Sequence, residues 1–96
     1  MAKLKGFYRY LALSPDGHYL VYGAKEGRYI GLYIMPSEGG RSLPLAVTQN
    51  SLNAGASWSP DGQRIAVIST RSGYYDIWIM DVNPDEIRSK LYTINQ

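Results

Sequence analysis

Ser14-Pro15-Asp16-Gly17 and Ser59-Pro60-Asp61-Gly62 are two copies of one tetrapeptide that lie 45 positions apart. Self-similarity at a fixed spacing of 20 to 50 residues indicates a repeat architecture. The chain therefore reads as two units of about 45 residues that together account for nearly its whole length. The same offset, without a gap, matches further identical residues: Tyr29 with Tyr74, Ile34 with Ile79, Met35 with Met80 and Thr48 with Thr93.

Each unit is expected to contain four short strands. Pro at the second position of the tetrapeptide, Asp at the third and Gly at the fourth suit a hairpin turn between the first and second strands. The nearly continuous apolar runs after each turn favour strands buried on both faces. Residues 86–90 are predicted to form a connecting loop, with one helical turn as the alternative. The predicted strands are residues 7–13, 19–22, 30–35 and 45–48 in the first unit, and 54–58, 65–68, 76–81 and 91–94 in the second.

Four strands in a unit of roughly 40 to 45 residues are typical of β-propeller blades. We therefore predict an all-β fold of two four-stranded blades. Residues 1–6 form an N-terminal tail, residues 7–51 the first blade and residues 52–96 the second.

Three stretches of the second unit carry a family resemblance. Residues 56–66 (ASWSPDGQRIA), 70–73 (TRSG) and 76–81 (DIWIMD) resemble a repeat of the TolB-like propeller family. The resemblance spans all of the second unit and most of the first, and it implies a ring of six blades. The first unit departs from it at the second turn, where Lys25-Glu26 replaces Thr70-Arg71 and Gly31 replaces Asp76.

Two blades share one interface and leave two apolar faces open, because a blade is stabilised mainly by its neighbours. Copies of a two-blade chain can close a ring of four, six or eight blades through head-to-tail contacts. With six blades implied, we expect a cyclic homotrimer. The alternative is a piece of a longer propeller.

Composition excludes several classes of protein. Ten Lys and Arg against eight Asp and Glu give a net charge of +2, which does not suit a nucleic-acid binder. There is no cysteine, and His18 is the only histidine, so we expect no metal site, no cofactor and no histidine-based catalysis. No apolar run is long enough for a membrane span, and residues 1–6 do not resemble a signal peptide. The chain as it stands is expected to be cytoplasmic, or periplasmic if it derives from a TolB-like parent.

The two turn aspartates, Asp16 and Asp61, are explained by turn chemistry. One such residue per blade is expected to place them tens of ångströms apart around a ring, whereas paired-carboxylate hydrolysis needs roughly 5 to 9 Å. No catalytic residue is therefore predicted.

The candidate binding residues lie in connections that are expected to line one mouth of the ring. Arg71 and Asp76 flank the second turn of the second unit; they either contact a ligand or form an ion pair that fixes the hairpin. The other candidates for binding a ligand or partner are Arg28, Lys25, Glu26 and Asn53. Trp58 and Trp78 occupy apolar positions of the repeat, which favours packing between blades over stacking on a ligand.

The leading functional hypothesis is a non-catalytic module that binds a protein or peptide, as the TolB-like resemblance implies. A second hypothesis is a fragment of the accessory propeller of a prolyl-oligopeptidase-like peptidase. A third is a propeller that binds a small molecule or glycan.

Overall fold

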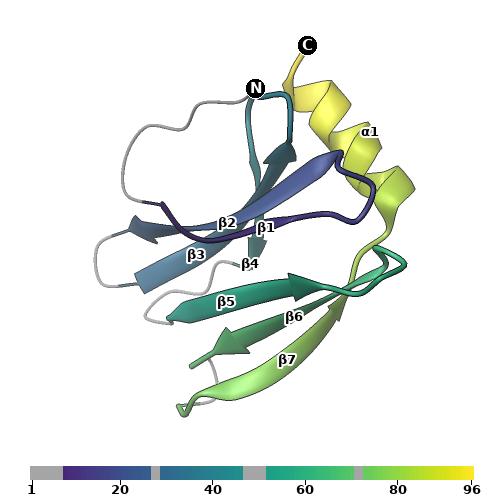
Figure 1. The fold of residues 1–96 in the computed structure, drawn as a ribbon. Coiled ribbons are helices and arrows are strands. Elements are labelled where there is room, and N and C mark those ends of the chain that lie inside the picture. Colours follow the sequence, from purple (N-terminus) through teal and green to yellow (C-terminus); the bar gives the residue numbers. More distant parts are fainter. Residues whose placement is uncertain (1–7, 27–28, 47–51, 71–72) are drawn as a thin grey trace.

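Seven strands and one helix make up the described part of the chain, residues 8–26, 29–46, 52–70 and 73–96 of a computed structural model (Figure 1). All paired strands are antiparallel and neighbours in sequence. The first sheet contains β1 (Tyr8–Leu13), β2 (Tyr19–Glu26), β3 (Tyr29–Pro36) and β4 (Leu43–Ala46); the second contains β5 (Asn53–Trp58), β6 (Arg64–Ser69) and β7 (Asp76–Asp81), which α1 (Pro84–Ile94) follows.

The two sheets fall within the two predicted units, and the mostly β architecture is confirmed. The first sheet lies in residues 7–51, and the second sheet with α1 lies in residues 52–96. The tail of residues 1–6 is outside the described residues, so the unit boundaries stay predictions.

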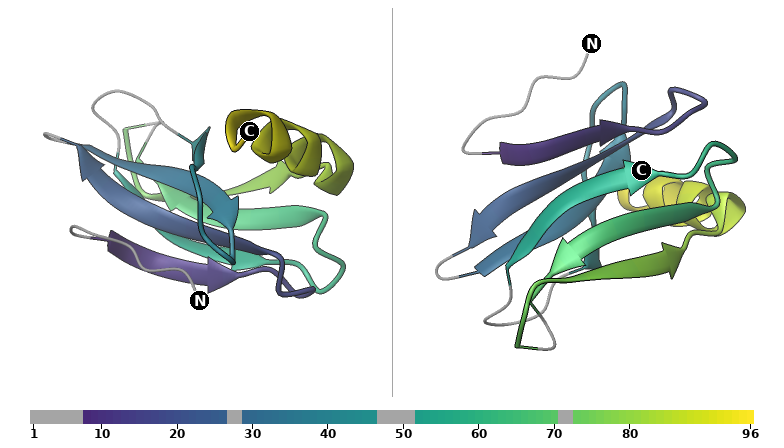
Figure 2. Two further views of the ribbon diagram at one scale, coloured as in Figure 1. Left: turned by 90° about the horizontal axis from the view of Figure 1, so that it is seen from above. Right: turned by 60° about the horizontal axis from the view of Figure 1, so that its bottom comes forward.

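The sheets stack face to face and bury an apolar core between them (Figures 1 and 2). Val21, Leu32 and Ile34 line the inner face of the first sheet, and Ile65 and Val67 line the inner face of the second. Fully burying a side chain of this size stabilises the fold by roughly 1.5 to 3 kcal/mol. The contact between the two sheets is therefore the main source of stability in the described part of the chain.

In the first sheet, β2 is buried on both faces, whereas in the second sheet β6 is buried mainly on its inner face. In β2, Val21 is buried on the inner face and Tyr22 on the outer face, where its ring stacks on Tyr33 with centroids 5.8 Å apart. In β6, Ile65 is buried inward while Ile68 is exposed on the outer face. No described element covers that outer face of the second sheet.

The prediction of a fourth strand at residues 91–94, and of a loop at residues 86–90, is wrong: both segments belong to α1. Asn83 caps the helix, because its side-chain Oδ1 accepts hydrogen bonds from the backbone N–H groups of Asp85 and Glu86 at 3.0 and 3.1 Å. Pro84 stands at the first helical position, where its missing N–H costs nothing. The second sheet accordingly has three strands.

Ion pairs along the exposed side of α1 also stabilise the helix. Arg88 bonds Asp85 at 2.8 Å and Lys90 bonds Glu86 at 2.7 Å, at helical spacings of three and four. The opposite side packs inward through Ile87 and Leu91. The helix lies at the end of the sheets that holds the β1–β2 and β5–β6 turns (Figures 1 and 2); we call this the turn end, and the other the mouth end.

Replacing the cap, Asn83→Ala, should lower the free energy of unfolding by about 1 kcal/mol, because two helical N–H groups lose their acceptor. Urea denaturation followed by circular dichroism measures the change. Ser89→Ala, an exposed site within the same helix, is the matched control and should be within about 0.5 kcal/mol of wild type. Equal stability of Asn83→Ala and the control would contradict this account of the helix.

Candidate functional site

The first turn at the turn end is held by a closed set of hydrogen bonds. Gly17 N–H donates to Ser14 O at 2.9 Å, which closes the turn, and Gly17 has a φ of 78° that suits glycine. The Ser14 hydroxyl donates to Asp16 Oδ1 at 2.6 Å and accepts from Tyr19 N–H at 3.0 Å. The same Asp16 oxygen accepts from His18 N–H at 2.9 Å. Ser14 and Asp16 are thus fully explained as turn-forming residues.

The second turn repeats this geometry atom for atom. The Ser59 hydroxyl donates to Asp61 Oδ1 at 2.5 Å and accepts from Arg64 N–H at 3.0 Å. Gln63 N–H donates to the same carboxylate oxygen at 3.0 Å, and Gly62 has a φ of 74°. The prediction that the tetrapeptide forms a hairpin turn in each unit is confirmed.

Hydrogen bonding holds both turn carboxylates in their ionised form. The pKa of Asp16 is lowered by the Ser14 hydroxyl and then by His18 N–H; the pKa of Asp61 is lowered by the Ser59 hydroxyl and then by Gln63 N–H. At neutral pH each turn therefore places one negative charge at the turn end.

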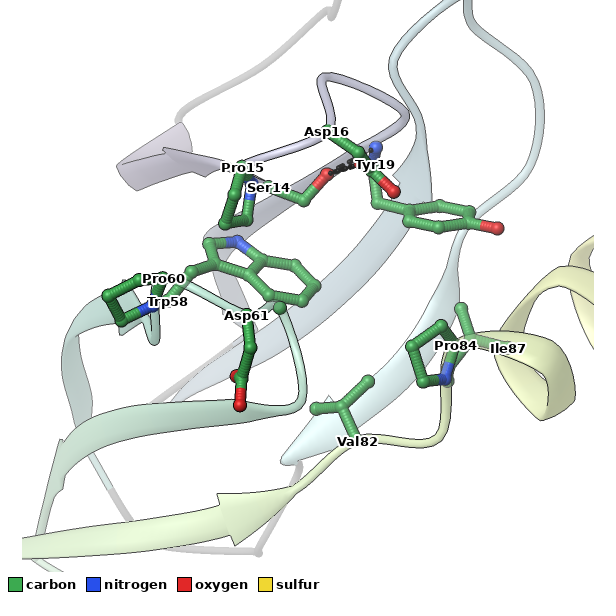
Figure 3. Close-up of a pocket in the computed structure, with 11 residues that line it drawn as sticks. Ser14, Pro15, Asp16, Tyr19, Trp58, Pro60, Asp61, Val82, Pro84 and Ile87 are labelled. Atoms are coloured by element: carbon green, nitrogen blue, oxygen red, sulfur yellow. Dashed lines mark hydrogen bonds between the residues drawn. The ribbon is translucent and has the colours of Figure 1, made fainter.

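The two turns and the start of α1 enclose a cavity of about 300 Å³, here called the turn-end cavity (Figure 3). In Figure 3 the Trp58 indole lies between the first turn and Val82, and Tyr19, Pro84 and Ile87 lie to the right of the indole. Burial raises the pKa of Tyr19, so its hydroxyl is neutral at neutral pH. The cavity is lined by Ser14, Pro15, Asp16, Tyr19, Trp58, Pro60, Asp61, Gly62, Val82, Pro84 and Ile87.

This cavity corrects one prediction, that Asp16 and Asp61 lie tens of ångströms apart. Both carboxylates line the same cavity, because consecutive sheets pack face to face and bring equivalent turns together. Sequence reasoning had assigned both residues to separate turns, and it had not found the helix that closes the cavity with Pro84 and Ile87. The sequence signal that predicts this helix is Asn83-Pro84-Asp85-Glu86, a helix N-cap followed by proline and two acidic residues.

The candidate residues predicted at the mouth end are only partly described. Lys25, near the end of β2, and Asp76, at the start of β7, are exposed there. Arg28 and Arg71 lie outside the described residues, and Glu26 is placed only as the last backbone position of β2. A binding role for these five residues stays a prediction.

Asn53, the remaining candidate, is buried between the two sheets. Its side-chain Nδ2 donates to Ile30 O at 2.7 Å, which ties the start of β5 to the start of β3. Next to it, Leu52 forms a parallel bridge with Ile30, and Leu52 N–H donates to the Thr70 hydroxyl at 2.8 Å. Asn53 thus has a structural contact at the mouth end, and a binding role for it stays a prediction.

Trp58 packs between the sheets as predicted. Its indole Nε1 donates to Ala12 O in β1 at 3.1 Å, so it contacts the other unit directly. Trp78 pairs with Val67 and shares the inner face of the second sheet, but it remains exposed at the β7 edge.

Within residues 8–26, 29–46, 52–70 and 73–96, no group of three or more His, Asp or Glu side chains is placed to hold a metal ion. The one described helix, α1, has eleven residues and is too short to cross a bilayer.

Comparisons with known proteins agree with this architecture. The chain is 33% identical over 85 residues to the Tol-Pal system protein TolB of Francisella tularensis, covering 85% of this chain and 19% of that protein. It is also 33% identical over 72 residues to an uncharacterised protein of Agrobacterium fabrum, covering 74% of this chain and 24% of the relative. The chain thus spans a quarter of the length of these relatives or less. No protein-family model matches it.

Two solved structures share the fold. A protein from Agrobacterium tumefaciens that is described as a TolB superposes with a TM-score of 0.67 at 28% identity, covering 82% of this chain and 27% of that one. TolB from Acinetobacter baumannii superposes with a TM-score of 0.66 at 21% identity, covering 84% of this chain and 20% of that one. The stacked sheets are consistent with β-propeller blades. The two repeats belong to the TolB-like propeller family.

The lowered pKa values predict how stability depends on pH. Each turn aspartate contributes stability above its usual pKa of 3.8, and this contribution is lost as the pH falls through the lower pKa of the folded state. In the double variant Asp16→Asn/Asp61→Asn the amide oxygen still accepts the turn hydrogen bonds but carries no charge. Its thermal midpoint should therefore fall less steeply than that of wild type below pH 3.8.

Glu86 adds a contribution of the same sign, because hydrogen bonding to Lys90 lowers its pKa. It is present in both proteins, so the difference between the two slopes isolates the turn aspartates. Parallel slopes for wild type and the double variant would contradict the charged state assigned to the turns.

Proposed function

We propose that this chain is a non-catalytic β-propeller module that binds a protein or peptide and completes its ring by packing head to tail on copies of itself. The observation that carries the proposal is the relation between its two open faces. Each open face has, at the 45-residue offset, the positions that form one side of the interface inside the chain.

The open face of the second sheet is apolar. Ile77 and Ile79 in β7 point to this face and are 72% and 62% exposed. The 45-residue offset matches them with Leu32 and Ile34, which are both fully buried on the inner face of the first sheet. In the first unit these positions pack against the second sheet. In the second unit no described sheet lies against them.

The open face of the first sheet also exposes apolar side chains, here from β1. Leu11 and Leu13 in β1 are 61% and 58% exposed. At the same offset their counterparts are Ala56 and Trp58, which pack against the first sheet across the interface. The outer face of one copy therefore suits the opposite outer face of the next, which is a heterologous contact that closes into a ring. Three copies supply the six blades that the family resemblance implies.

Mass measurement by light scattering after size exclusion tests the assembly. Wild type is expected at three times the 10.8 kDa chain mass across a range of concentrations. Ile77→Lys/Ile79→Lys should give a monomer, since two charges on the outer face oppose its burial. Tyr92→Lys, which replaces an equally exposed apolar residue on α1, should keep the wild-type mass. A monomeric wild type, or a double variant of unchanged mass, would overturn the ring.

The mouth end is the proposed place of partner binding. The end of β2, the end of β6 and the start of β5 lie there, and Lys25 and Asp76 present charges of both signs. Loops that join strands at the end of a rigid sheet commonly carry binding residues. A closed ring would repeat these charges around its mouth, and membership of the TolB-like family supports a protein or peptide as the partner.

Selection from random peptides displayed on phage tests this site. Peptides that bind wild type through the mouth end should lose binding to Lys25→Glu or Asp76→Lys. They should still bind Asp61→Asn, because that substitution is at the turn end. If no enriched peptide lost binding on either mouth-end substitution, the proposed location would be contradicted.

A further inference from the structure

The turn-end cavity combines apolar walls with charge of one sign. Trp58, Tyr19, Val82 and Ile87 contribute aromatic and aliphatic surface, and three prolines add to it. Among the described residues that line the cavity, Asp16 and Asp61 alone carry a charge at neutral pH. A neutral apolar ligand would leave both carboxylates unused, whereas a cation with an apolar stem matches both features.

We propose that the turn-end cavity binds a basic peptide segment of a partner protein, with an arginine side chain entering between Trp58 and the two turn carboxylates. This site is at the opposite end of the sheets from the mouth, so the proposal goes beyond the function proposed above and does not depend on it. Assembly through the outer faces leaves the turn end open.

The size of the cavity suits such a ligand. Its volume of about 300 Å³ is twice the ~150 Å³ of an engineered apolar cavity that holds benzene. It therefore has room for one long side chain together with part of an apolar neighbour. The aliphatic stem of arginine can pack on Pro15, Pro60 and Val82 while its charged head stays at the rim.

The carboxylates have unused capacity for a charged donor. In each turn, Oδ1 accepts two hydrogen bonds, from the serine hydroxyl and the backbone N–H two residues on. Asp61 Oδ2 accepts none from the residues that the structure describes, and Asp16 Oδ2 has only His18 Nδ1 nearby, at 3.9 Å. A guanidinium suits this arrangement better than an ammonium, since it bonds carboxylates with several donors and stacks on an indole face.

Neighbouring cations do not cancel the negative charge of the cavity. Arg88 is close enough to act on the pKa of Tyr19, but its guanidinium is paired with Asp85 at 2.8 Å. Lys90 is paired with Glu86 in the same helix. Each cation of α1 is thus matched by a carboxylate of α1. Arg64, which is close enough to act on Asp61, is paired with Asp81 at 3.6 Å.

Titration of the isotope-labelled chain with two capped tripeptides, followed by NMR, tests the proposal. Acetyl-Leu-Arg-Leu-amide should shift the Trp58 indole N–H and the backbone N–H groups of Gly62 and Val82. Acetyl-Leu-Gln-Leu-amide, which has the same apolar residues without the charge, should bind about tenfold more weakly, as expected for loss of a charge-assisted hydrogen bond.

Variants of the protein that lack one cavity carboxylate are titrated with the same two peptides. Asp61→Asn should weaken binding of the arginine peptide about tenfold and leave the glutamine peptide unchanged. Asp16→Asn is the second variant, and thermal melting shows whether each remains folded. Glu38→Gln, at an exposed carboxylate between β3 and β4 that does not line the cavity, should bind both peptides as wild type does.

Three results would overturn the proposal. The first is equal affinity of wild type for the two peptides, and the second is a set of shifts confined to the mouth end. The third is the absence of any shift at Trp58, Gly62 and Val82. None of these results bears on the mass of the assembly, and the second would itself support binding at the mouth end. Failure of this proposal is therefore separable from failure of the proposed function.

Discussion

The apolar contact between the two sheets is the constraint on which the remaining features depend. Neither sheet has a core of its own, so Val21, Leu32 and Ile34 become buried only because Ile65 and Val67 lie opposite them. This contact places the two Ser-Pro-Asp-Gly turns side by side and brings Trp58 against β1. The turn-end cavity and the hydrogen bond from Asn53 to Ile30 O at the mouth end both follow from it. The same physics leaves the two outer faces without partners.

Much of the fold could be predicted from the repeated tetrapeptide, because its chemistry is local. The Ser and Asp side chains hydrogen-bond to each other and to backbone N–H groups no more than five residues away. The turn therefore forms in the same way in both units. Strand positions followed from the offset between the units. The error at α1 arose from extending that offset to the end of the chain. There Asn83 and Pro84 impose a helix start that the first unit lacks, and this local signal overrides the similarity between the units.

The candidate site was less predictable, because it depends on distances between units. Asp16 and Asp61 are far apart in sequence, and a repeat alone states only that they occupy equivalent positions. Whether equivalent positions are neighbours is decided by how the sheets stack. Asn53 illustrates the converse: as a polar residue in a connection it was expected at a binding surface, but its amide is buried and bonds Ile30 O across the interface.

The end of α1 has a consequence for how the molecule unfolds. The Asn95 side chain accepts a hydrogen bond from Arg41 N–H at 2.6 Å and donates to Arg41 O at 3.3 Å. The helix that follows the second sheet is therefore bonded to the segment just before β4 of the first sheet. Gly40 leaves the space for this contact, since a Cβ there would lie 2.4 Å from Asn95 Oδ1. Repeat arrays whose units touch only along one interface can melt one unit at a time. Here loss of the second sheet would also remove the helix from the first, so we expect the two repeats to unfold as a single cooperative unit.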